Sequence, residues 1–515
     1  MEKGSKRRGD RRGVALTALL AISGAAADTP APSPVTSIPL PRPRVPAPSS
    51  RPSAIPLPRP IVDPTSTRTE KVPLGEPLVP GQLIQPIDLA SALRLAGARD
   101  LDIAIAREQI AVALADLEQS RVLLIPSLFL GPSWIRHDGQ VQTVQGPVQS
   151  ISKSSLFLGA TAAAGSSVSG PVPAGGPSQV SGLTSILRIS DAIFQPLAAR
   201  RVVAARRAGL QVATNDALLT VAEAYLDLQL AAGRLNIARE AERNASRLTE
   251  ITGSYARAGQ GLEADHERSL TERDRQRRNI EAAVGQLEIA SAELVRLLHL
   301  DPQIVVAPVE PPVTILRLCP DNPPLDDLIV QALHQRPELA EAQALVEATL
   351  TRLKEAKLRP LIPSVALTYS GGGFGGGVNG FFGNFGARSD AAVNLFWELN
   401  HLGLGDRAVM HGRAAEQRVA LLQLVKTQDR VAADVVSAYK QRIASSRQVD
   451  DSGRSVDAAL RSFEQNLARI QRAAGLPLEV LQPIQALAQV RGDYLEAVLS
   501  YNRSQFRLRR AIGQP

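Results

Sequence analysis

Leu124-Ile125-Pro126-Ser127 is repeated in this chain as Leu361-Ile362-Pro363-Ser364, and each copy ends a segment with an apolar helical pattern. The two segments cover residues 88–127 and 325–364. Each is followed by Gly/Ser-rich sequence with short strand-like runs, and then by about a hundred residues of helical pattern. A unit made of a helix, strands and a long helical hairpin therefore occurs twice. Such a duplication is larger than the repeat of a small solenoid.

The segments after the two prolines predict β-strands. In the second copy, Val365, Leu367 and Tyr369 alternate with small or polar residues, and Val393-Leu395-Trp397 repeats the alternation after a Gly-rich link. In the first copy the pattern is poorer, starts with Leu128, Leu130 and Trp134, and continues with one or two more strands in residues 155–194. Two strands per copy, of about ten residues each, fit tilted strands that cross a membrane.

The helical parts predict unusually long helices. The segment from Asp88 to Val122 reads as one helix, and residues 198–257 contain no proline. A continuous helix over 198–257 would be ~90 Å long at 1.5 Å per residue. Because a helix of that length cannot bury itself in one globular core, it must lie against other long helices. Its apolar residues follow alternating steps of three and four, which is typical of a coiled-coil seam: Leu218, Val221, Tyr225, Leu228, Ala232 and Leu235.

The N-terminal residues predict an export signal followed by a tether. A basic stretch precedes the apolar run Val14 to Ala27, which is too short for a membrane-spanning helix of ~20 residues. A membrane anchor or a surface helix is the alternative reading. We therefore divide the chain into a signal peptide (1–27), a Pro-rich disordered tether (28–86), a first repeat (87–302), a linker (303–324) and a second repeat (325–515). Proline lacks an amide hydrogen, so the tether is expected to form neither helix nor sheet.

Composition argues against several functional classes. Of the formal charge of +8, residues 1–27 carry +4 and residues 28–86 carry +2, which leaves only +2 for residues 87–515. A protein that binds nucleic acid needs a basic surface, so this small net charge argues against such a function. Cys319 is the only cysteine, so no disulfide within the chain can form. The six histidines lack a metal-ligand spacing. We expect no catalytic residue, no cofactor and no metal.

A Gly-rich run at residues 371–377 invites comparison with a phosphate-binding loop. No Gly-Lys-Ser/Thr follows it, and the run lies between two predicted strands without a helix start. A flexible surface loop or a strand edge is the expected structure, with Phe381 and Phe382 as interfacial aromatic residues. The chain is therefore not expected to be an enzyme.

Taken together and in order, several features make residues 87–515 resemble the TolC-like outer-membrane efflux proteins. Each feature occurs in both copies: a helix that starts with apolar residues, a proline that opens the strands, an Ala-Tyr pair on the long helix, a Gly turn, and a leucine-rich end. The residues concerned are Leu89/Ala92/Ala96 and Leu325/Ile329/Ala332, Arg336-Pro337-Glu338-Leu339, Pro126 and Pro363, Ala224-Tyr225 and Ala438-Tyr439, Gly259/Leu262 and Gly475/Leu478, and the endings at 294–302 and 508–513.

The resemblance implies a mainly α-helical fold with a small transmembrane β part. Long helical hairpins would form a periplasmic α-barrel, and four β-strands per subunit would join a 12-stranded β-barrel in a homotrimer. The protein would lie in the outer membrane, in contact with its lipid, with the helical part in the periplasm. It would be the passive exit duct of a tripartite efflux or type I secretion system, driven by an inner-membrane pump through a periplasmic adaptor.

The resemblance also implies two kinds of site at the periplasmic end. The Gly turns would contact the adaptor through Ala258, Gly259, Gly261, Leu262, Ala474, Gly475 and Leu478. Acidic residues after the turn often close such tunnels, and Asp265 occupies that place in the first copy. Asp265 is also a first-turn acid of the kind that the helix dipole favours. In the second copy Leu481 and Ile484 stand there instead, so an apolar constriction is a second option.

A different class of protein remains open at this point. An exported, soluble coiled-coil scaffold or adaptor would also have long helices and a signal. It does not account for the doubled proline and alternating strand pattern. Apolar residues exposed on the strands at 365–369 and 393–397 would distinguish the channel from the scaffold.

Overall fold

The computed structural model describes residues 82–125, 127–143, 145–163, 166–167, 185–320, 323–378, 383–471 and 478–514. The chain divides into two units, residues 1–70 and residues 71–515, and every described residue belongs to the second unit. The predicted signal and most of the predicted tether, including the Pro-rich stretch before residue 82, therefore lie outside the described residues. So do Phe381 and Phe382.

The first helical segment is two helices and not the single helix predicted from Asp88 to Val122. Helix α1 spans Leu89–Arg99 and α2 spans Leu101–Arg121. Asp100 separates them, and its side chain accepts hydrogen bonds from the backbone N–H groups of Asp102 (2.8 Å) and Ile103 (3.1 Å). Asp100 is thus the N-cap of α2, since it satisfies amides that lack a partner within the helix.

The second copy has the same break. Helix α5 spans Leu325–Gln335 and α6 spans Pro337–Leu358, with Arg336 between them. Proline suits the first position of a helix because its missing N–H would have no helical partner there. A 3-10 turn then precedes the strands in each copy, at Val122–Leu124 and at Arg359–Leu361.

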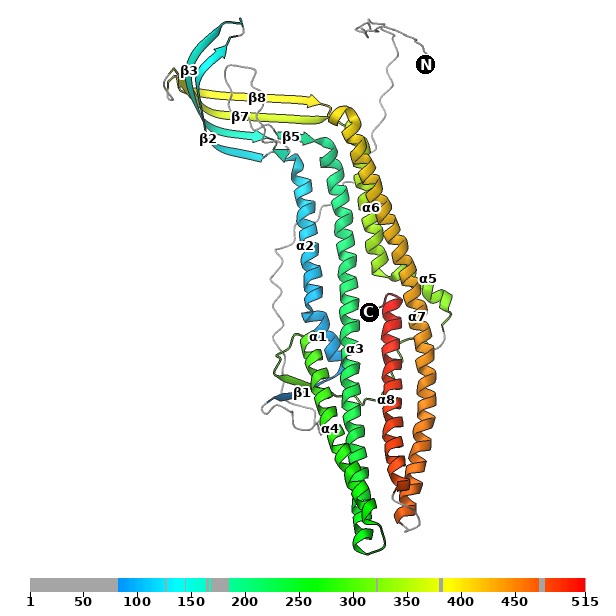
Figure 1. Cartoon of the computed structure of the whole chain (residues 1–515). Helices are drawn as coiled ribbons and strands as arrows, with labels where there is room; N and C mark the ends of the chain where they lie inside the picture. The colour runs from blue at the N-terminus through cyan, green and yellow to red at the C-terminus, as the bar shows by residue number, and fades with distance from the viewer. Residues whose placement is uncertain are drawn as a thin grey trace, which may run out of the picture. The chain divides into compact units, whose positions relative to one another are not determined.

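The long helices are confirmed. Helix α3 spans Ile189–Arg257 and α7 spans Leu404–Gln471, while the shorter α4 (Glu263–Leu297) and α8 (Leu478–Ala511) return alongside them (Figure 1). Near the strands, α2, α3, α6 and α7 lie side by side in that order. Further from the strands, α4 packs on α3, and α8 packs on both α7 and α3.

Among the described residues, five apolar clusters hold these helices together, and three of them are larger than the others. The first joins α1, α3 and α4 around Tyr225, Leu228 and Leu294, which are fully buried. The second joins α5, α7 and α8 around Val435 and Leu508. The third lies near the hairpin ends and joins α3, α7 and α8. Each helix is therefore stabilised by its neighbours and not by a single central core.

The four main strands form an antiparallel sheet in the order β2, β3, β7, β8 (Figure 1). Their bounds are Ser127–Gln142, Val148–Ala163, Ser364–Gly377 and Gly386–Phe396. The short strand β5, Ser185–Arg188, also pairs with β7 and leads into α3, and β4, Ser166–Ser167, pairs with β5. Each copy thus contributes two long strands, and β2 and β3 are longer than the predicted ten residues.

The Gly-rich run lies inside β7 and is not a flexible loop. Its glycines are required by the close approach of β3: a Cβ on Gly372 would lie 2.4 Å from the carbonyl oxygen of Leu158, and one on Gly376 would lie 2.3 Å from that of Ser154. Both contacts are with backbone, which cannot move aside without breaking the ladder. Glycine is depleted in strands in general, but at these positions the backbone of β3 lies too close to leave room for a Cβ.

A small two-stranded sheet lies beside the middle of the long helices. Strand β1, Leu83–Ile87, pairs in parallel with β6, Ile304–Pro308. The end of the predicted tether is therefore part of a sheet, and the predicted linker contains a strand. Tyr225 fixes this sheet to α3, because its hydroxyl donates to the carbonyl of Ile87 and to Glu310. Among the described helices, none is both long and apolar enough to span a membrane.

Candidate functional site

The sheet has one apolar face that is exposed in the protomer. Val365, Leu367 and Tyr369 of β7 stand directly opposite Leu395, Val393 and Ala391 of β8, so all six lie on one face. The exposed fractions are 41% for Leu367, 54% for Tyr369, 70% for Val393 and 58% for Leu395. This is the exposed apolar surface that the sequence predicted for a channel.

The same face continues across the other two strands. Leu158 of β3 lies between Pro132 of β2 and Gly373 of β7, and Leu156 lies next to Trp134. Leu158 and Trp134 are each 56% exposed. Bulky apolar side chains thus cover this face over all four strands.

The opposite face of the sheet carries polar and charged groups. On β8, Nε of Arg388 donates to Asp390 over 2.7 Å, and its guanidinium lies 4.8 Å from the ring centre of Phe374 on β7. Ser370 stands directly opposite Asp390 on the same face. The first face also carries an ion pair, Arg136–Asp138 of β2, but between Trp134 and the helices it is apolar, which suits contact with lipid.

The hairpin end between α3 and α4 is a tight turn at residues 258–262. Gly259 has a φ of +69°, and its N–H donates to Ala256, while the N–H of Gln260 donates to Tyr255. These bonds close the C-terminus of α3 with a left-handed glycine, as is common at helix ends. The predicted contact residues Ala258, Gly259, Gly261 and Leu262 all belong to this turn, and Leu262 is 69% exposed.

The corresponding turn between α7 and α8 includes Ala474 and Gly475, which lie outside the described residues. Leu478 is the first residue of α8. The adaptor contacts assigned to both turns remain predictions.

Asp265 lies in the first turn of α4 and is largely covered. Its side chain is 14% exposed, and its carboxylate forms an ion pair with the guanidinium of Arg268, with 3.4 Å between nitrogen and oxygen. Its backbone N–H donates to the carbonyl of Leu262. The carboxylate is therefore paired within its own helix, and its position also fits a helix-dipole acid.

Leu481 and Ile484 do not form the predicted constriction. Their side chains are 9% and 2% exposed, and they pack with Leu248, Phe463 and Ile470 in the cluster that joins α3, α7 and α8. The three-residue spacing places both leucine and isoleucine on the face of α8 that meets its neighbours. Side chains buried inside the protomer cannot line a tunnel.

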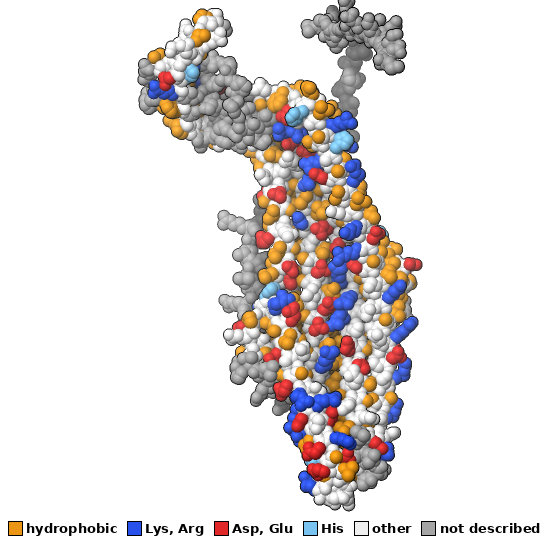
Figure 2. All heavy atoms as spheres, viewed as in Figure 1, with side chains coloured by type: hydrophobic (Ala, Val, Ile, Leu, Met, Phe, Trp, Pro, Cys, Tyr) orange, Lys and Arg blue, Asp and Glu red, His pale blue; other side chains and the backbone are white. Residues whose placement is uncertain are grey.

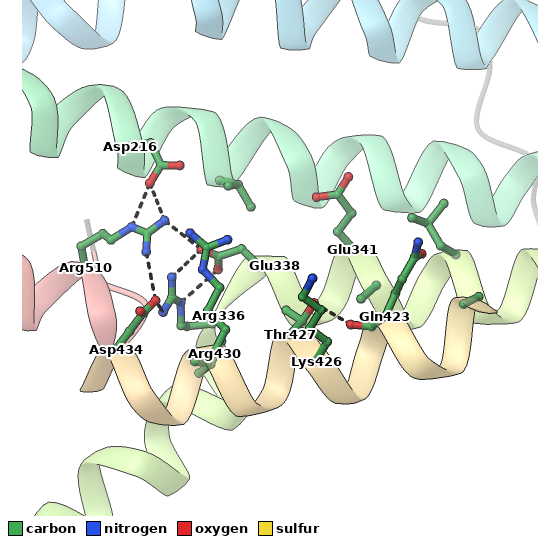
Figure 3. Close-up of a pocket in the computed structure, with 15 residues that line it drawn as sticks. Asp216, Arg336, Glu338, Glu341, Gln423, Lys426, Thr427, Arg430, Asp434 and Arg510 are labelled. Atoms are coloured by element: carbon green, nitrogen blue, oxygen red, sulfur yellow. Dashed lines mark hydrogen bonds and ion pairs between the residues drawn. The ribbon is translucent and has the colours of Figure 1, made fainter. Parts of the chain in front are cut away.

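A charged cluster at the junction of four helices was not predicted from the sequence. Arg336 is 3% exposed in its side chain, and it donates to both carboxylate oxygens of Glu338 and to Asp434 of α7 at 3.0 Å. Arg510 of α8 bridges Glu338 at 3.1 Å and Asp216 of α3 at 2.6 Å (Figure 3). Burial is the largest single influence on Glu338 and opposes its ionisation, but the hydrogen bonds that its carboxylate accepts, together with the charges of Arg336 and Arg510, hold the pKa of Glu338 below its ordinary value.

This cluster borders a cavity of about 430 Å³ between α3, α6 and α7 (Figure 3). The Arg336-Pro337-Glu338 motif was visible in the sequence, but its partners lie far away in the chain. The cluster therefore ties the first and second repeats together where α8 ends.

A row of ion pairs between α3 and α8 was also missed. The two helices are antiparallel, and acids of α3 face arginines of α8 at intervals of four to seven residues along α3, with one reversed pair (Figure 2 shows charged side chains of both signs along the helices). The pairs are Asp216–Arg510, Glu223–Arg507, Asp227–Arg503, Arg234–Glu496 and Glu240–Arg491. For the first three pairs, the charged residues are spaced by seven and four residues on α3 and by three and four residues on α8, and this spacing was the signal available in the sequence.

The described residues do not bring three His, Cys, Asp or Glu side chains together as a metal site would. Cys319 is half-buried, and burial raises the pKa of its thiol. Its N–H donates to the side chain of Gln505 at 3.1 Å, so it helps to fix the segment after β6 against α8. The candidate sites are therefore the apolar face of the sheet and the hairpin turns, and we assign no reaction chemistry to them.

Comparison with known proteins agrees with this architecture. A family model described as outer membrane efflux protein matches residues 328–514. The fold is similar to that of the outer-membrane channel OprN (TM-score 0.68, 17% identity, 83% of this chain and 90% of that chain covered). It is also similar to the CmeC outer membrane channel of Campylobacter jejuni (TM-score 0.66, 15% identity, 82% of this chain and 85% of that chain covered).

A third similar structure is the open state of the MtrE outer membrane channel of Neisseria gonorrhoeae (TM-score 0.63, 18% identity, 83% of this chain and 89% of that chain covered). No curated protein matches the sequence. The family match lies in the second repeat, whereas the structural matches extend over both. The second repeat thus matches the outer membrane efflux protein family over residues 328–514, and the chain as a whole shares the fold of outer-membrane channels.

Proposed function

We propose that this protein is an outer-membrane channel that serves as the passive exit duct of a tripartite efflux or type I secretion system. The observation that carries the proposal is the sheet whose exposed face is apolar over all four strands and whose strands continue into helices of 69 and 68 residues. The sheet suits the outer membrane and the helices suit the periplasm. An inner-membrane pump would supply the energy through a periplasmic adaptor.

The open edges of the protomer support a homotrimer. Among the described strands, β2 and β8 each pair on one side only, and unpaired strand edges are not tolerated in lipid. Three copies would join four strands each into a 12-stranded barrel. The outer helices of the row carry matching apolar surface, with Ile105 and Val112 of α2 and Leu422 and Val425 of α7 more than half exposed.

The hairpin ends are the proposed contact with the adaptor. They are the parts of the helices furthest along the chain from the strands, and the turn at 258–262 presents Leu262 to solvent. Residues 474–478 would form the second contact. We further propose that residues 1–27 are an export signal and that the Pro-rich residues after them are a tether.

The alternative, a soluble exported scaffold, is disfavoured by the sheet. A soluble protein would expose Val393, Leu395, Tyr369, Trp134 and Leu158 to water on a single face. Contiguous apolar surfaces of this kind mark contact with lipid or with another protein.

The decisive experiment measures where the protein resides, how large it is and whether it conducts. We expect it in the outer-membrane fraction, as a particle with the mass of three chains after detergent extraction, and we expect ion conductance in planar lipid bilayers. A soluble monomer or dimer in the periplasm would contradict the proposal.

Two adjacent substitutions on β8 sharpen the test, because Val393 lies on the apolar face and Asn394 on the opposite one. Val393→Arg should cost up to about 2–4 kcal/mol in lipid and reduce the amount of trimer. Asn394→Arg, the matched control, should assemble normally. Equal effects of the two substitutions would mean that the apolar face does not meet lipid.

A further inference from the structure

The connection between β8 and α7 has an unusual backbone. Strand β8 ends at Phe396 and α7 begins at Leu404, and a 3-10 turn at Asn400–Gly403 lies between them. His401 (φ 51°), Leu402 (φ 56°) and Gly403 (φ 85°) are all left-handed. Glycine and asparagine adopt this conformation readily, whereas a branched apolar residue does so at a cost. Strain of this kind is retained where the surrounding structure or a function requires it.

Leu402 is in addition almost fully exposed. Its exposed fraction of 96% is the largest of any bulky apolar residue in the described part of the chain. Water-exposed leucine and left-handed leucine are each unfavourable, and here they coincide at one position. An aqueous loop would be better served by glycine or asparagine.

The turn is nevertheless held firmly in place. Asp406 is 6% exposed, and its carboxylate accepts from the backbone N–H of Asn400 (3.0 Å) and from the side-chain amide of Asn400 (2.9 Å). Just before the turn, Glu398 pairs with Arg188 (3.1 Å) and Arg359 (3.6 Å). The connection therefore presents Leu402 from a fixed base.

Leu402 belongs to a larger apolar patch, which we call the corner patch. Its members are bulky, lie where the strands meet the helices and are all more than half exposed: Leu361 (72%), Trp397 (57%), Leu399 (64%), Leu402 (96%) and Leu404 (70%). The indole N–H of Trp397 donates to the carbonyl of Leu361 at 3.4 Å, which joins the two connections. In Figure 2 hydrophobic side chains gather at the end of the helices next to the strands.

The patch continues the apolar face of the sheet. Val393 and Leu395 of β8 are 70% and 58% exposed, and the exposed residues Trp397 and Leu399 extend their alternation beyond the strand. The first repeat has no equivalent turn, because β5 ends at Arg188 and α3 begins at Ile189. The corner patch is thus an addition of the second repeat at the boundary between sheet and helices.

We propose that the corner patch inserts into the periplasmic leaflet of the outer membrane and anchors the channel at that depth. The proposal rests on the proposed function, which places the apolar face of the sheet in lipid. Leucine side chains would enter the acyl region, and Trp397 suits the interface because it has an apolar body and a polar N–H. His401, Arg407 and His411 are exposed beside the patch and would face the phosphate headgroups.

A second copy of the chain is the rival occupant of this patch. A copy would meet β8 along its open edge through backbone hydrogen bonds, whereas Val393, Leu395 and Trp397 continue the face of the sheet. Continuity with that face favours lipid.

The test places a fluorescent reporter at three single cysteines in a Cys319→Ser background, which has no other cysteine. The substitutions are Leu402→Cys in the corner patch, Val393→Cys on the sheet face and Leu262→Cys in the hairpin turn. Each full-length protein is labelled with a polarity-sensitive dye and placed in vesicles of phosphatidylethanolamine and phosphatidylglycerol. Quenching is measured with lipids brominated near the headgroup and with aqueous iodide.

We expect the dye at 402 to be quenched several-fold more by the shallow bromolipid than by iodide, and the dye at 262 to show the reverse. A dye at 402 that iodide quenches as it does at 262 overturns the proposal. A dye at 402 that neither agent quenches also overturns it, because a protein contact then covers the patch. In both cases bromolipid quenching at 393 shows that the proposed function still stands, whereas its absence at 393 would count against that function.

Substitutions at Leu402 check that the leucine itself is needed. Asparagine tolerates the left-handed backbone but removes the apolar side chain, and methionine keeps an apolar side chain of similar size. With Trp397 as the reporter in a Trp134→Phe background, Leu402→Asn should lower the quenching of tryptophan fluorescence by the shallow bromolipid several-fold, while Leu402→Met should behave like the parent. No change with asparagine would overturn the proposal.

Discussion

At the scale of single residues, Glu355 on α6 combines burial with a neighbouring negative charge. It borders a cavity with Arg413 and Arg352. Burial, and then the charge of Asp191, raise the pKa of Glu355 from 4.5 to about 7. Because the folded state binds the proton more tightly than the unfolded chain, this carboxyl favours folding below pH 4.5, and the advantage is lost as the pH rises through 7.

We therefore predict that Glu355→Gln stabilises the protein at pH 8 and has little effect at pH 4. The expected gain at pH 8 is about 1–2 kcal/mol, after allowance for the solvent around a half-buried group. Thermal unfolding in detergent at the two pH values measures it. Glu347→Gln, at an exposed position paired with Arg201, is the matched control. A gain of equal size at both pH values would contradict the raised pKa.

At the scale of elements, the glycines of β7 connect sequence to sheet geometry. We predict that Gly372→Ala disrupts the sheet, because the new Cβ would lie 2.4 Å from a backbone oxygen of β3. The expected cost is about 1–3 kcal/mol, in the range of overpacked sites. Gly377→Ala is the control, since nothing lies within 4 Å of a Cβ there. Strand protection in hydrogen exchange measures both, and equal protection in the two variants would argue against the close approach.

The same strand shows what the sequence could and could not predict. Alternation at Val365, Leu367 and Tyr369 reveals a strand and its exposed face, because side chains on a strand have a period of two. The glycines that follow carry no such pattern, and only the partner strand explains them. Register between β3 and β7 depends on residues separated by about two hundred positions, so a local pattern cannot reveal it.

The helices show the same limit. The presence of the long helices follows from apolar periodicity, although α3 includes Pro196 and α8 includes Pro483. The break at Asp100 was missed because the apolar pattern continues across it, although aspartate is a strong N-cap. Leu481 and Ile484 were misassigned because a periodic apolar pattern does not say whether a face meets another helix or a lumen. Asp216, Arg336 and Arg510 meet only after folding.

At the scale of the whole molecule, ion pairs join the two repeats along α3 and α8. Each pair is partly exposed and worth only about 0.2–1 kcal/mol, but a row of them fixes how the antiparallel helices align. We predict that Glu223→Arg and Arg507→Glu each lower the melting temperature by a few degrees, and that the double exchange restores most of the loss. Melting curves at low and high salt check this. Additive losses in the double variant would show that the two side chains do not interact.

The proposed trimer requires that the contacts between neighbouring copies form a closed ring of three chains. The apolar edge of α2 in one copy would face that of α7 in the next, so the interface joins two different surfaces. Such head-to-tail contacts form a ring only if the rotation closes, and otherwise they continue as a filament. The number of linked chains therefore distinguishes a closed channel from open association.

We predict that Val112→Cys and Val419→Cys, combined in the Cys319→Ser background, link neighbouring copies through a bismaleimide spacer. Both valines are exposed, at 63% and 53%, on the two edges of the helix row. Denaturing gels should show monomer, linked dimer and linked trimer, and no larger species. Each single cysteine alone should remain monomeric, because identical edges do not meet in a ring of this kind. A ladder beyond three chains, or a dimer from either single variant, would refute the closed arrangement even if the protein resides in the outer membrane.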